Sequence, residues 1–277
     1  MKIDDPILAG TYAFFNLGCP KNLVDAEHVA AELENAGWLS APSPDRAALL
    51  VVTTCAFIAS AMEESVEEIL RIGAAKREGQ ILAVLGCLVS REGASLQKLL
   101  PEVDMFCTVG EMHLLPSRLA ARAGDGGGRV AAAPSTGRGI PCRSSAPAGR
   151  RLFTPPHLAY LKIADGCSNR CSYCMIPAIR GDLESRSRNE ILEEASQLAA
   201  AGVEELVVVA QDTTAWGFEG EKKDNLYDLL EALADGTRFD WIRLMYLHPS
   251  HVDVDRLVPL IKGGAICPDL DKPIQHV

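Results

Sequence analysis

The stretch GCSNRCSYC, residues 166–174, contains three cysteines in nine residues. Their spacing is Cys-x3-Cys-x2-Cys, formed by Cys167, Cys171 and Cys174, and no fourth cysteine follows nearby. Thiolates are the usual ligands of iron–sulfur clusters, and so short a loop suits three corners of a cubane. The fourth iron would keep an open position, which is where catalytic metals generally bind a substrate or cofactor. We therefore expect a four-iron four-sulfur (4Fe–4S) cluster with one open iron at this loop.

The alternative for this loop is one half of a structural zinc site. Cys267 or His248 would then complete the site from a distant part of the chain. Structural zinc sites favour pairs of closely spaced ligands, and the loop instead presents three thiols in a row. The spacing therefore favours the iron–sulfur cluster over zinc.

Three further cysteines stand at similar places in the N-terminal part of the chain. Cys19, Cys55 and Cys87 each follow an apolar run that predicts a strand, FFNLGC, LVVTTC and LAVLGC. The carboxyl ends of parallel strands line one edge of a sheet, where ligands bind. A single buried cysteine is an ordinary small apolar residue, but the repeated position favours a second site of three thiolates. The other cysteines show no such pattern and are interpreted as buried or linker thiols: Cys107, Cys142 and Cys267.

Strands and helices are predicted to alternate over the first 120 residues. We expect strands at 11–18, 48–54, 80–86 and 105–109, and helices at 21–36, 60–70 and 91–100. Ser60 and Glu63 match the capping-box pattern at the start of the second helix. This alternation indicates a parallel sheet that is covered by helices on both faces.

Residues 121–153 separate this region from the rest of the chain. Gly, Ala, Pro, Ser and Arg dominate the stretch without any apolar period, so we expect a flexible linker at a domain boundary. From residue 154 the alternation resumes. Strands are expected at 158–164, 205–210 and 241–247, and helices from the Ser187–Glu190 capping box to Gly202, at 225–235 and at 253–262.

The second domain holds three complete βα units in this reading. Residues 273–277, PIQHV, resemble the start of a fourth strand, and the chain stops there. A closed eight-stranded barrel needs roughly 200 residues or more. We therefore expect either an open, partial barrel or a fragment.

The composition is that of a soluble globular protein. The 277 residues, 48% hydrophobic and 23% charged, suffice for one large domain or two ordinary ones. No run approaches the roughly 18 apolar residues of a membrane helix, and the first residues do not resemble a secretory signal. We expect a cytoplasmic protein, where nine cysteines indicate metal binding or catalysis rather than disulfides. The net charge of −10 is unlike that of broad nucleic-acid binders.

The cysteine loop and its continuation, GCSNRCSYCMIPAIRG, resemble the signature of radical S-adenosylmethionine (SAM) enzymes and, more narrowly, of the methylthiotransferases. Segments near the other cysteines look like the N-terminal domain of the same family: 17–27, 53–70 and 85–91. The loop alone indicates the superfamily, whereas the combination is specific for the methylthiotransferases. The resemblance covers residues 11–115 and 157–277.

The resemblance implies an α/β fold in two domains. Residues 1–120 would form an open parallel-sheet methylthiotransferase domain that carries the second iron–sulfur cluster. Residues 121–153 would be the linker, and residues 154–277 an incomplete (β/α) radical SAM barrel. The family has a small C-terminal β-barrel domain called TRAM, and we expect these 277 residues not to include it.

Within the family, the sequence resembles the branch that modifies an aspartate of small-subunit ribosomal protein uS12. The segments that carry this resemblance are 18–27, 171–181, 207–217 and 241–252. The branch that modifies a tRNA adenosine (MiaB type) typically has Gln-Met-Asn where this chain has Pro20-Lys21-Asn22, and Gln-Asn where it has Gln211-Asp212. A tRNA methylthiotransferase and an inactive iron–sulfur-binding fragment are the alternatives.

The resemblance also implies cofactors and roles. The first set of thiols would hold the 4Fe–4S cluster that binds SAM and cleaves it to a radical: Cys167, Cys171 and Cys174. The second set would hold a 4Fe–4S cluster whose open iron carries the sulfur for transfer: Cys19, Cys55 and Cys87. The expected partners are uS12 as substrate and an electron donor such as flavodoxin or ferredoxin. We expect a monomer with no membrane partner.

Residues outside the cysteine sets are also candidates for contact with the cofactor. Gln211 and Asp212 follow a predicted strand, where barrel active sites form, and are expected to contact the methionine part of SAM; a loop cap is the alternative for them. Arg180, Arg186 and Arg188 are candidates for pairing with its carboxylate, with solvated surface arginine as the equal alternative.

Overall fold

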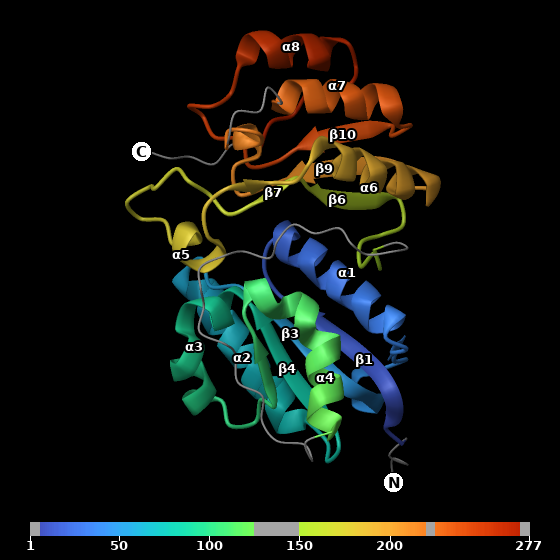
Figure 1. Cartoon of the computed structure of the whole chain (residues 1–277), viewed down its shortest axis with the longest axis vertical. Coiled ribbons are helices and arrows are strands. Elements are labelled where there is room, and N and C mark those ends of the chain that lie inside the picture. Colours follow the sequence, from blue (N-terminus) through green and yellow to red (C-terminus); the bar gives the residue numbers. More distant parts are fainter. Residues whose placement is uncertain (1–5, 125–149, 220–224, 272–277) are drawn as a thin grey trace. The chain divides into compact units, whose positions relative to one another are not determined.

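A computed structural model describes residues 6–124, 150–219 and 225–271 of the chain (Figure 1). The chain divides into two compact units. The first comprises Met1–Ile140 together with Tyr173–Arg180, and the second comprises Pro141–Ser172 together with Gly181–Val277. The segment that follows the cysteine loop therefore packs with the N-terminal unit. The predicted linker lies largely outside the described residues, as do Cys142 and residues 273–277.

The first unit is built on a five-stranded parallel sheet of order β2-β1-β3-β4-β5. Its strands are β1 (Leu8–Asn16), β2 (Leu39–Ser40), β3 (Ala47–Thr54), β4 (Ile81–Gly86) and β5 (Met105–Cys107). The central strand β3 reads AALLVVTT and is buried along nearly its whole length. Such a run is typical of a strand covered on both faces. The expected parallel α/β fold is confirmed.

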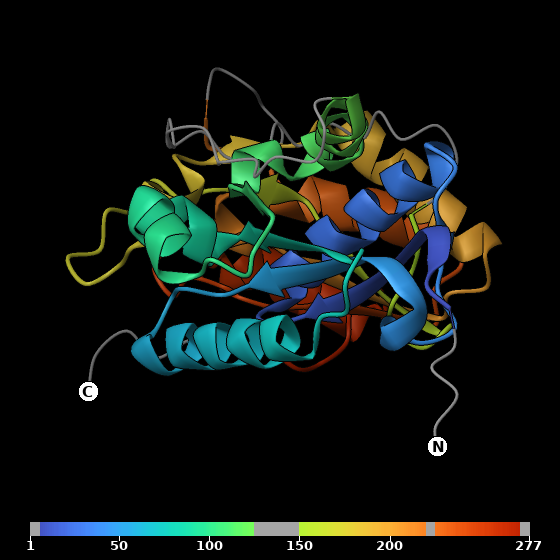
Figure 2. The same ribbon diagram turned by 90° about the horizontal axis from the view of Figure 1, so that it is seen from below.

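Helices cover both faces of this sheet (Figure 2), and an apolar cluster lies on each face. The helices are α1 (Pro20–Asn35), α2 (Ala59–Ala75), α3 (Cys87–Leu99) and α4 (Leu115–Gly124), with the short η1 (Pro44–Arg46) and η2 (Val109–Leu114) between strands and helices. On one face α2 and α3 pack against Leu50, Val52 and Leu82. On the other, α1 and α4 pack against Leu49 and Val51. Alternate residues of one strand thus serve the two faces.

Three local expectations for the first unit need correction. The Ser60–Glu63 capping box is wrong: α2 already begins at Ala59, the N-cap is Ile58, and no side chain caps it. Ser60 lies inside the first turn, two positions after the N-cap, and so cannot cap the helix. Helix α3 begins at Cys87 rather than at 91, because the chain turns directly from β4 into the helix. Helix α4 extends to Gly124, inside the stretch predicted as linker.

The second unit contains a parallel sheet of order β10-β9-β6 and a short antiparallel pair. The strands are β6 (Leu158–Lys162), β9 (Glu205–Val209) and β10 (Trp241–Leu244), with β7 (Ala164–Asp165) and β8 (Glu184–Ser185) forming the pair. One apolar cluster joins the sheet to α6 (Arg188–Ala200), α7 (Leu226–Gly236) and α8 (Val254–Lys262). The Ser187–Glu190 capping box at the start of α6 is confirmed.

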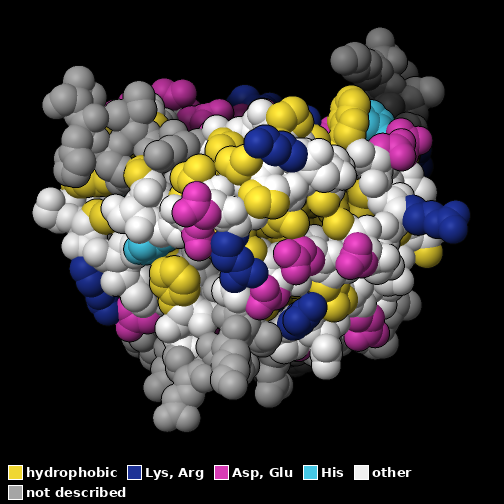
Figure 3. Space-filling model, turned by 90° about the horizontal axis from the view of Figure 1, so that it is seen from above, with side chains coloured by type: hydrophobic (Ala, Val, Ile, Leu, Met, Phe, Trp, Pro, Cys, Tyr) yellow, Lys and Arg dark blue, Asp and Glu magenta, His cyan; other side chains and the backbone are white. Residues whose placement is uncertain are grey.

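Helix α8 presents much of its surface outward. Leu257 is its one residue classed as buried, whereas Val254 and Val258 are exposed, as is Leu270 beyond the helix. Figure 3 shows apolar side chains among acidic and basic ones on the face that includes this helix. In the part of the chain that the structure describes, every helix is too short or too polar to cross a membrane.

Candidate functional site

The three N-terminal thiols follow three neighbouring strands. Cys19 comes shortly after β1, Cys55 directly after β3, and Cys87 directly after β4. Since β1, β3 and β4 are adjacent and parallel, their carboxyl ends bring these cysteines to one edge of the sheet. Burial raises the pKa of the Cys87 thiol, the nearby Arg180 lowers it, and the charges of Cys19 and Cys55 raise it. The three thiols therefore lie within electrostatic reach of one another.

Close backbone contact at Gly18 helps to bring these loops together. Gly18 has φ +105°, and a Cβ there would lie 2.6 Å from Asn22 Nδ2 and 3.0 Å from the Cβ of Cys55. Only glycine reaches this conformation without strain or collision. A glycine is therefore needed directly before Cys19, because the segments that follow β1 and β3 lie very close together there.

Asn22, on the first turn of α1, connects all three cysteine-bearing segments. Its side-chain NH2 donates to Leu17 O at 3.3 Å and to Thr54 O at 2.9 Å. Its Oδ1 lies 3.6 Å from Cys87 Sγ, which donates to it. Asn22 is 2% exposed. The sequence indicated Asn22 only as a marker between family branches; the signal for its role was a polar residue at the start of an amphipathic helix.

The cysteine loop of residues 167–174 is held by its own backbone surroundings. Cys167 N donates to Gly181 O at 3.1 Å, and Leu183 N donates to Ser168 Oγ at 3.1 Å. Gly166 has φ +67°, and a Cβ there would lie only 2.0 Å from Asp182 O. The backbone at Gly181 and Asp182 thus packs closely against the start of the loop. All three loop cysteines are half-buried, Cys174 belonging with α5 (Ile176–Arg180) to the first unit.

Asp165 anchors the base of this loop, and the sequence reading missed it. Its side chain is almost fully buried, and it accepts from the Gly166 backbone N–H at 2.9 Å. That oxygen, Oδ1, also accepts from Gln211 Nε2 at 2.8 Å, and Lys162 Nζ lies 3.1 Å from the other oxygen, Oδ2. An acidic residue that ends an apolar strand directly before Gly-Cys was the available signal.

Both residues predicted to contact the cofactor's methionine part lie beside the loop. Gln211 reaches its base through Asp165, and Asp212 Oδ2 accepts from Asn169, inside the loop, at 2.8 Å. Among the described residues the Oε1 atom of Gln211 is buried and has no hydrogen-bond partner. A buried acceptor of this kind suits a donor such as an amino group. Asp212 also caps the short helix η3 (Thr213–Ala215).

Asp212 forms a compact group with His248 and His251. One ligand-type atom from each lies within 4.8 Å of the other two. His251 Nδ1 is 2.7 Å from Asp212 Oδ2, which also accepts from Asn169. Thr214 donates to Oδ1 through both its backbone N–H and its hydroxyl. Because four hydrogen bonds already occupy the carboxylate, the group is a hydrogen-bonded pair with an adjacent imidazole rather than an open cation site.

The surface alternative is wrong for Arg186 and for Arg180, which are both buried. Arg186 is 4% exposed, pairs with Glu194 at 2.5 Å and donates to Lys162 O at 2.8 Å. Arg188 is half-buried and donates to Asp228 O at 3.3 Å.

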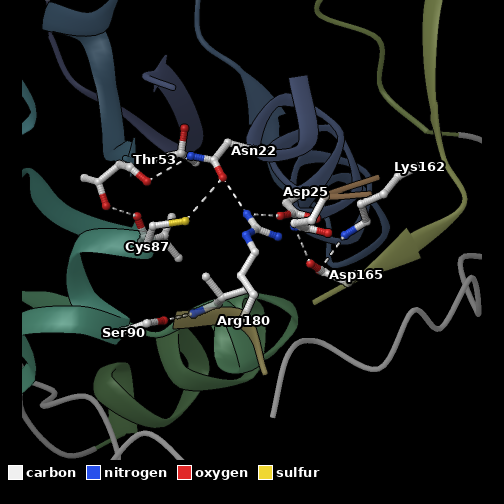
Figure 4. A network of polar contacts seen from close by, with 12 residues as sticks. Asn22, Asp25, Thr53, Cys87, Ser90, Lys162, Asp165 and Arg180 are labelled. Carbon is white, nitrogen blue, oxygen red and sulfur yellow. Dashed lines mark hydrogen bonds and ion pairs between the residues drawn. The ribbon is translucent and has the colours of Figure 1, made fainter. Parts of the chain in front are cut away.

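Arg180 is 2% exposed and reaches the N-terminal site (Figure 4). It donates to Asn22 Oδ1 at 2.5 Å and to Asp25 Oδ2 at 3.0 Å. The apolar periodicity of the sequence contained no signal for this contact.

The cysteines outside the two sets differ from them in setting. Cys107, in β5, is fully buried, and burial raises the pKa of its thiol to about 11. A thiol of that kind stays protonated and inert. Cys267 is half-buried near Arg243, away from the strand-end position of the site cysteines, and burial raises its pKa as well.

Two regions of the chain match known protein families. Residues 11–108 match the family described as "Uncharacterized protein family UPF0004", and residues 161–266 match the radical SAM superfamily. The ribosomal protein uS12 methylthiotransferase RimO of Syntrophus aciditrophicus (strain SB) is 44% identical over 264 residues, which are 95% of this chain and 58% of that protein. RimO of Carboxydothermus hydrogenoformans is 40% identical over 266 residues, 96% of this chain and 59% of that protein.

Over about 95% of its length the chain is similar to uS12 methylthiotransferases, and its second region matches the radical SAM superfamily. It spans a little under three fifths of the length of these curated relatives. The UPF0004 match contains the three strand-end cysteines, and the radical SAM match contains the cysteine loop.

A solved structure supports the fold. The radical SAM methyltransferase TsrM from Kitasatospora setae, in a structure with tryptophan substrate and a SAM analogue bound, aligns with a TM-score of 0.63. The alignment covers 97% of this chain and 60% of that chain, at 15% sequence identity. Identity this low carries the arrangement of strands and helices only.

Proposed function

We propose that this chain carries the machinery of a radical SAM methylthiotransferase whose target is the β-carbon of an aspartate in ribosomal protein uS12. The observation that carries the proposal is the presence of two three-thiol sets in one chain. One set lies in the loop of the radical SAM region, and the other at three adjacent strand ends. The 44% identity to a uS12 methylthiotransferase supports the choice of substrate.

Each thiol set would hold one 4Fe–4S cluster. The cluster ligands are Cys167, Cys171 and Cys174 for the SAM-binding cluster and Cys19, Cys55 and Cys87 for the second. The position of the second set at three adjacent strand ends fits a donor set of soft thiolates around one cluster. When bound, the clusters and SAM supply the radical and the transferred sulfur, while the protein holds and positions them.

Gln211 would bind the amino group of SAM. Its buried Oε1 lacks a hydrogen-bond partner among the described residues, and its Nε2 is already held by Asp165 at 2.8 Å. The amide is therefore oriented before the cofactor arrives. Asp212 would act less directly: its contact with Asn169 at 2.8 Å links the carboxyl end of β9 to the cysteine loop.

Two segments favour the ribosomal-protein branch over the tRNA branch. Pro20-Lys21-Asn22 follows the first cysteine, and Gln211-Asp212 follows β9. The acidic net charge of −10 is compatible with a basic protein target and gives no electrostatic support to tRNA binding.

Co-expression with uS12 and with total tRNA, followed by mass spectrometry, tests the substrate. The host should lack its own enzyme for either modification. The expected result is a gain of one methylthio group on an aspartate of uS12. A methylthiolated tRNA nucleoside, with uS12 unchanged, would overturn the assignment in favour of the tRNA branch.

Anaerobic reconstitution tests the cofactors before any substrate is added. Two cubane clusters correspond to about eight irons per chain. A chain that binds zinc alone, or no iron, would be a fragment without this activity. We further propose a cytoplasmic monomer that receives its electrons from a flavodoxin or ferredoxin. Size-exclusion chromatography tests the monomer, and reduction of the clusters by purified flavodoxin tests the electron donor.

A further inference from the structure

We propose that Arg180 is a positioning residue for the strand-end site, where its buried positive charge, held near Cys87 by Asn22, favours the reduced form of the cluster held by Cys19, Cys55 and Cys87. The inference rests on the proposed function, because it presupposes a cluster at these three thiols. It assigns to a residue just beyond the cysteine loop a role at the other cluster.

The first ground is the burial of an ion pair. Arg180 and Asp25 are each 2% exposed, and their charged atoms lie 3.0 Å apart. Burying two charges is costly, and the pair is weak evidence for stability by itself. A buried arginine that also has a second, neutral partner close to thiols points to a role in setting local charge.

The second ground is the contact that joins Arg180 to the site. Arg180 Nη2 donates to Asn22 Oδ1 at 2.5 Å, and Cys87 Sγ lies 3.6 Å from the same oxygen. Asn22 also binds the backbone at Leu17 and Thr54, which precede the other two cysteines closely. Arg180 therefore contacts the one side chain that touches all three cysteine-bearing segments. Figure 4 shows Asn22 between Cys87 and the guanidinium.

The third ground is the charge balance. Three thiolates concentrate negative charge at the edge of the sheet, and Asp25 offsets part of the single positive charge of Arg180. Reduction of a cluster adds one electron from an external donor, breaks no bond and makes the site one unit more negative. In a buried setting a nearby cation stabilises that extra charge, and cluster potentials respond to net charge and to hydrogen bonds.

Arg180 also links the segment after the cysteine loop to the strand-end site. Arg180 ends α5, which starts two residues after Cys174, and α5 packs against α3, the helix that begins at Cys87. Both helices belong to the first compact unit. The segment that leaves the radical-generating loop is therefore fastened to the strand-end site by a charged side chain.

The test isolates the strand-end cluster in the full chain. Substituting Cys167→Ala and Cys171→Ala together removes two of the three loop ligands and leaves the first unit unchanged. After anaerobic reconstitution, iron content is measured, and the reduction equilibrium is followed by electron paramagnetic resonance at poised potentials. Arg180→Met, Arg180→Lys and Asp25→Asn are compared in this background. Arg186→Met is the matched control, because Arg186 is an equally buried, ion-paired arginine of the second unit.

We expect Arg180→Met to shift the one-electron reduction equilibrium about tenfold toward the oxidised cluster, which is 59 mV. Arg180→Lys keeps the charge and should stay within about threefold of the parent. Asp25→Asn leaves the cation less compensated and should shift the equilibrium the opposite way. Arg186→Met should leave it unchanged.

Two results would overturn the inference. One is a cluster in Arg180→Met with the parental equilibrium. The other applies if Arg180→Met binds no iron: then an unchanged equilibrium in Asp25→Asn is decisive against it. Absence of iron from the parent background is a different failure, because it refutes the strand-end cluster of the proposed function.

Discussion

The two thiol sets differ in how the chain assembles them. Cys167, Cys171 and Cys174 lie in one loop, so the order of residues alone keeps them near each other. Cys19 and Cys87 lie far apart in sequence, and they meet only because β1, β3 and β4 are neighbours in a parallel sheet. The first arrangement depends on local backbone conformation, whereas the second depends on the folding of a whole unit.

The same difference appears in what surrounds each set. The loop is held in large part by residues next to it in the sequence, through bonds such as Cys167 N to Gly181 O at 3.1 Å and Gly166 N to Asp165 Oδ1 at 2.9 Å. The strand-end set is held by a side chain, Asn22, that bridges separate segments. Local sites can therefore be recognised from spacing, while dispersed sites need buried polar side chains that spacing does not indicate.

The largest expected effect separates the two sets by function. Cys171→Ala should abolish SAM cleavage, whereas Cys55→Ala should spare cleavage and abolish methylthiolation. The parent should bind about eight irons, and each variant should lose about half of them. Iron analysis and the yield of 5′-deoxyadenosine check this. Methylthiolation that survives Cys55→Ala would show that the strand-end set is not the second cluster site.

Cavities in the two cores should act on the two sets unequally. Leu82, in β4, and Leu206, in β9, are both fully buried, in the first and second unit respectively. Each Leu→Ala change should lower the unfolding free energy of its own unit by about 2–5 kcal/mol.

Hydrogen exchange and iron retention measure the consequences. Iron at the strand-end set, measured in the Cys167→Ala, Cys171→Ala background, should be lost more readily with Leu82→Ala than with Leu206→Ala. Equal losses would contradict the dependence of that set on its own sheet.

A smaller effect should come from the backbone at the start of the loop. Gly166→Ala would place a Cβ 2.0 Å from Asp182 O, in addition to a φ of +67°. Gly202→Ala, at φ +92° with no atom within 4 Å of the new Cβ, has only the conformational penalty, which is about 1–2 kcal/mol. Chemical denaturation should show a clearly larger loss for Gly166→Ala. Similar losses of stability in the two variants would mean that the backbone at Asp182 does not pack closely against Gly166.

The smallest effect should distinguish a serine that caps a helix, Ser187, from one that does not, Ser60. Ser187→Ala removes the side chain that accepts from Glu190 N, and should cost about 1 kcal/mol. Ser60→Ala, inside α2 and without a capping role, should change stability by less than about 0.5 kcal/mol. Thermal denaturation of the two variants checks the difference. A loss at Ser60 as large as that at Ser187 would restore the capping box that the sequence suggested.

Much of the frame was predictable from the sequence, for physical reasons that can be named. The apolar run at β3 and the helical spacing of apolar residues after Cys19 both reflect which residues are buried. Such patterns can be read from the sequence alone. The cap of α6 depends on residues three apart, Ser187 and Glu190. The boundaries were less predictable, because Ser60 has the right residue type one position inside its helix.

By itself, the sequence determined the alternating α/β fold, the cysteine loop and the placement of three more thiols at strand ends. It did so because spacing and alternation are local properties of the chain. Only the tertiary structure decided which buried polar groups meet these thiols. Arg180 and Asn22 are 158 residues apart in sequence and hydrogen-bonded in the fold. Such a contact depends on how segments pack, and no local pattern encodes it.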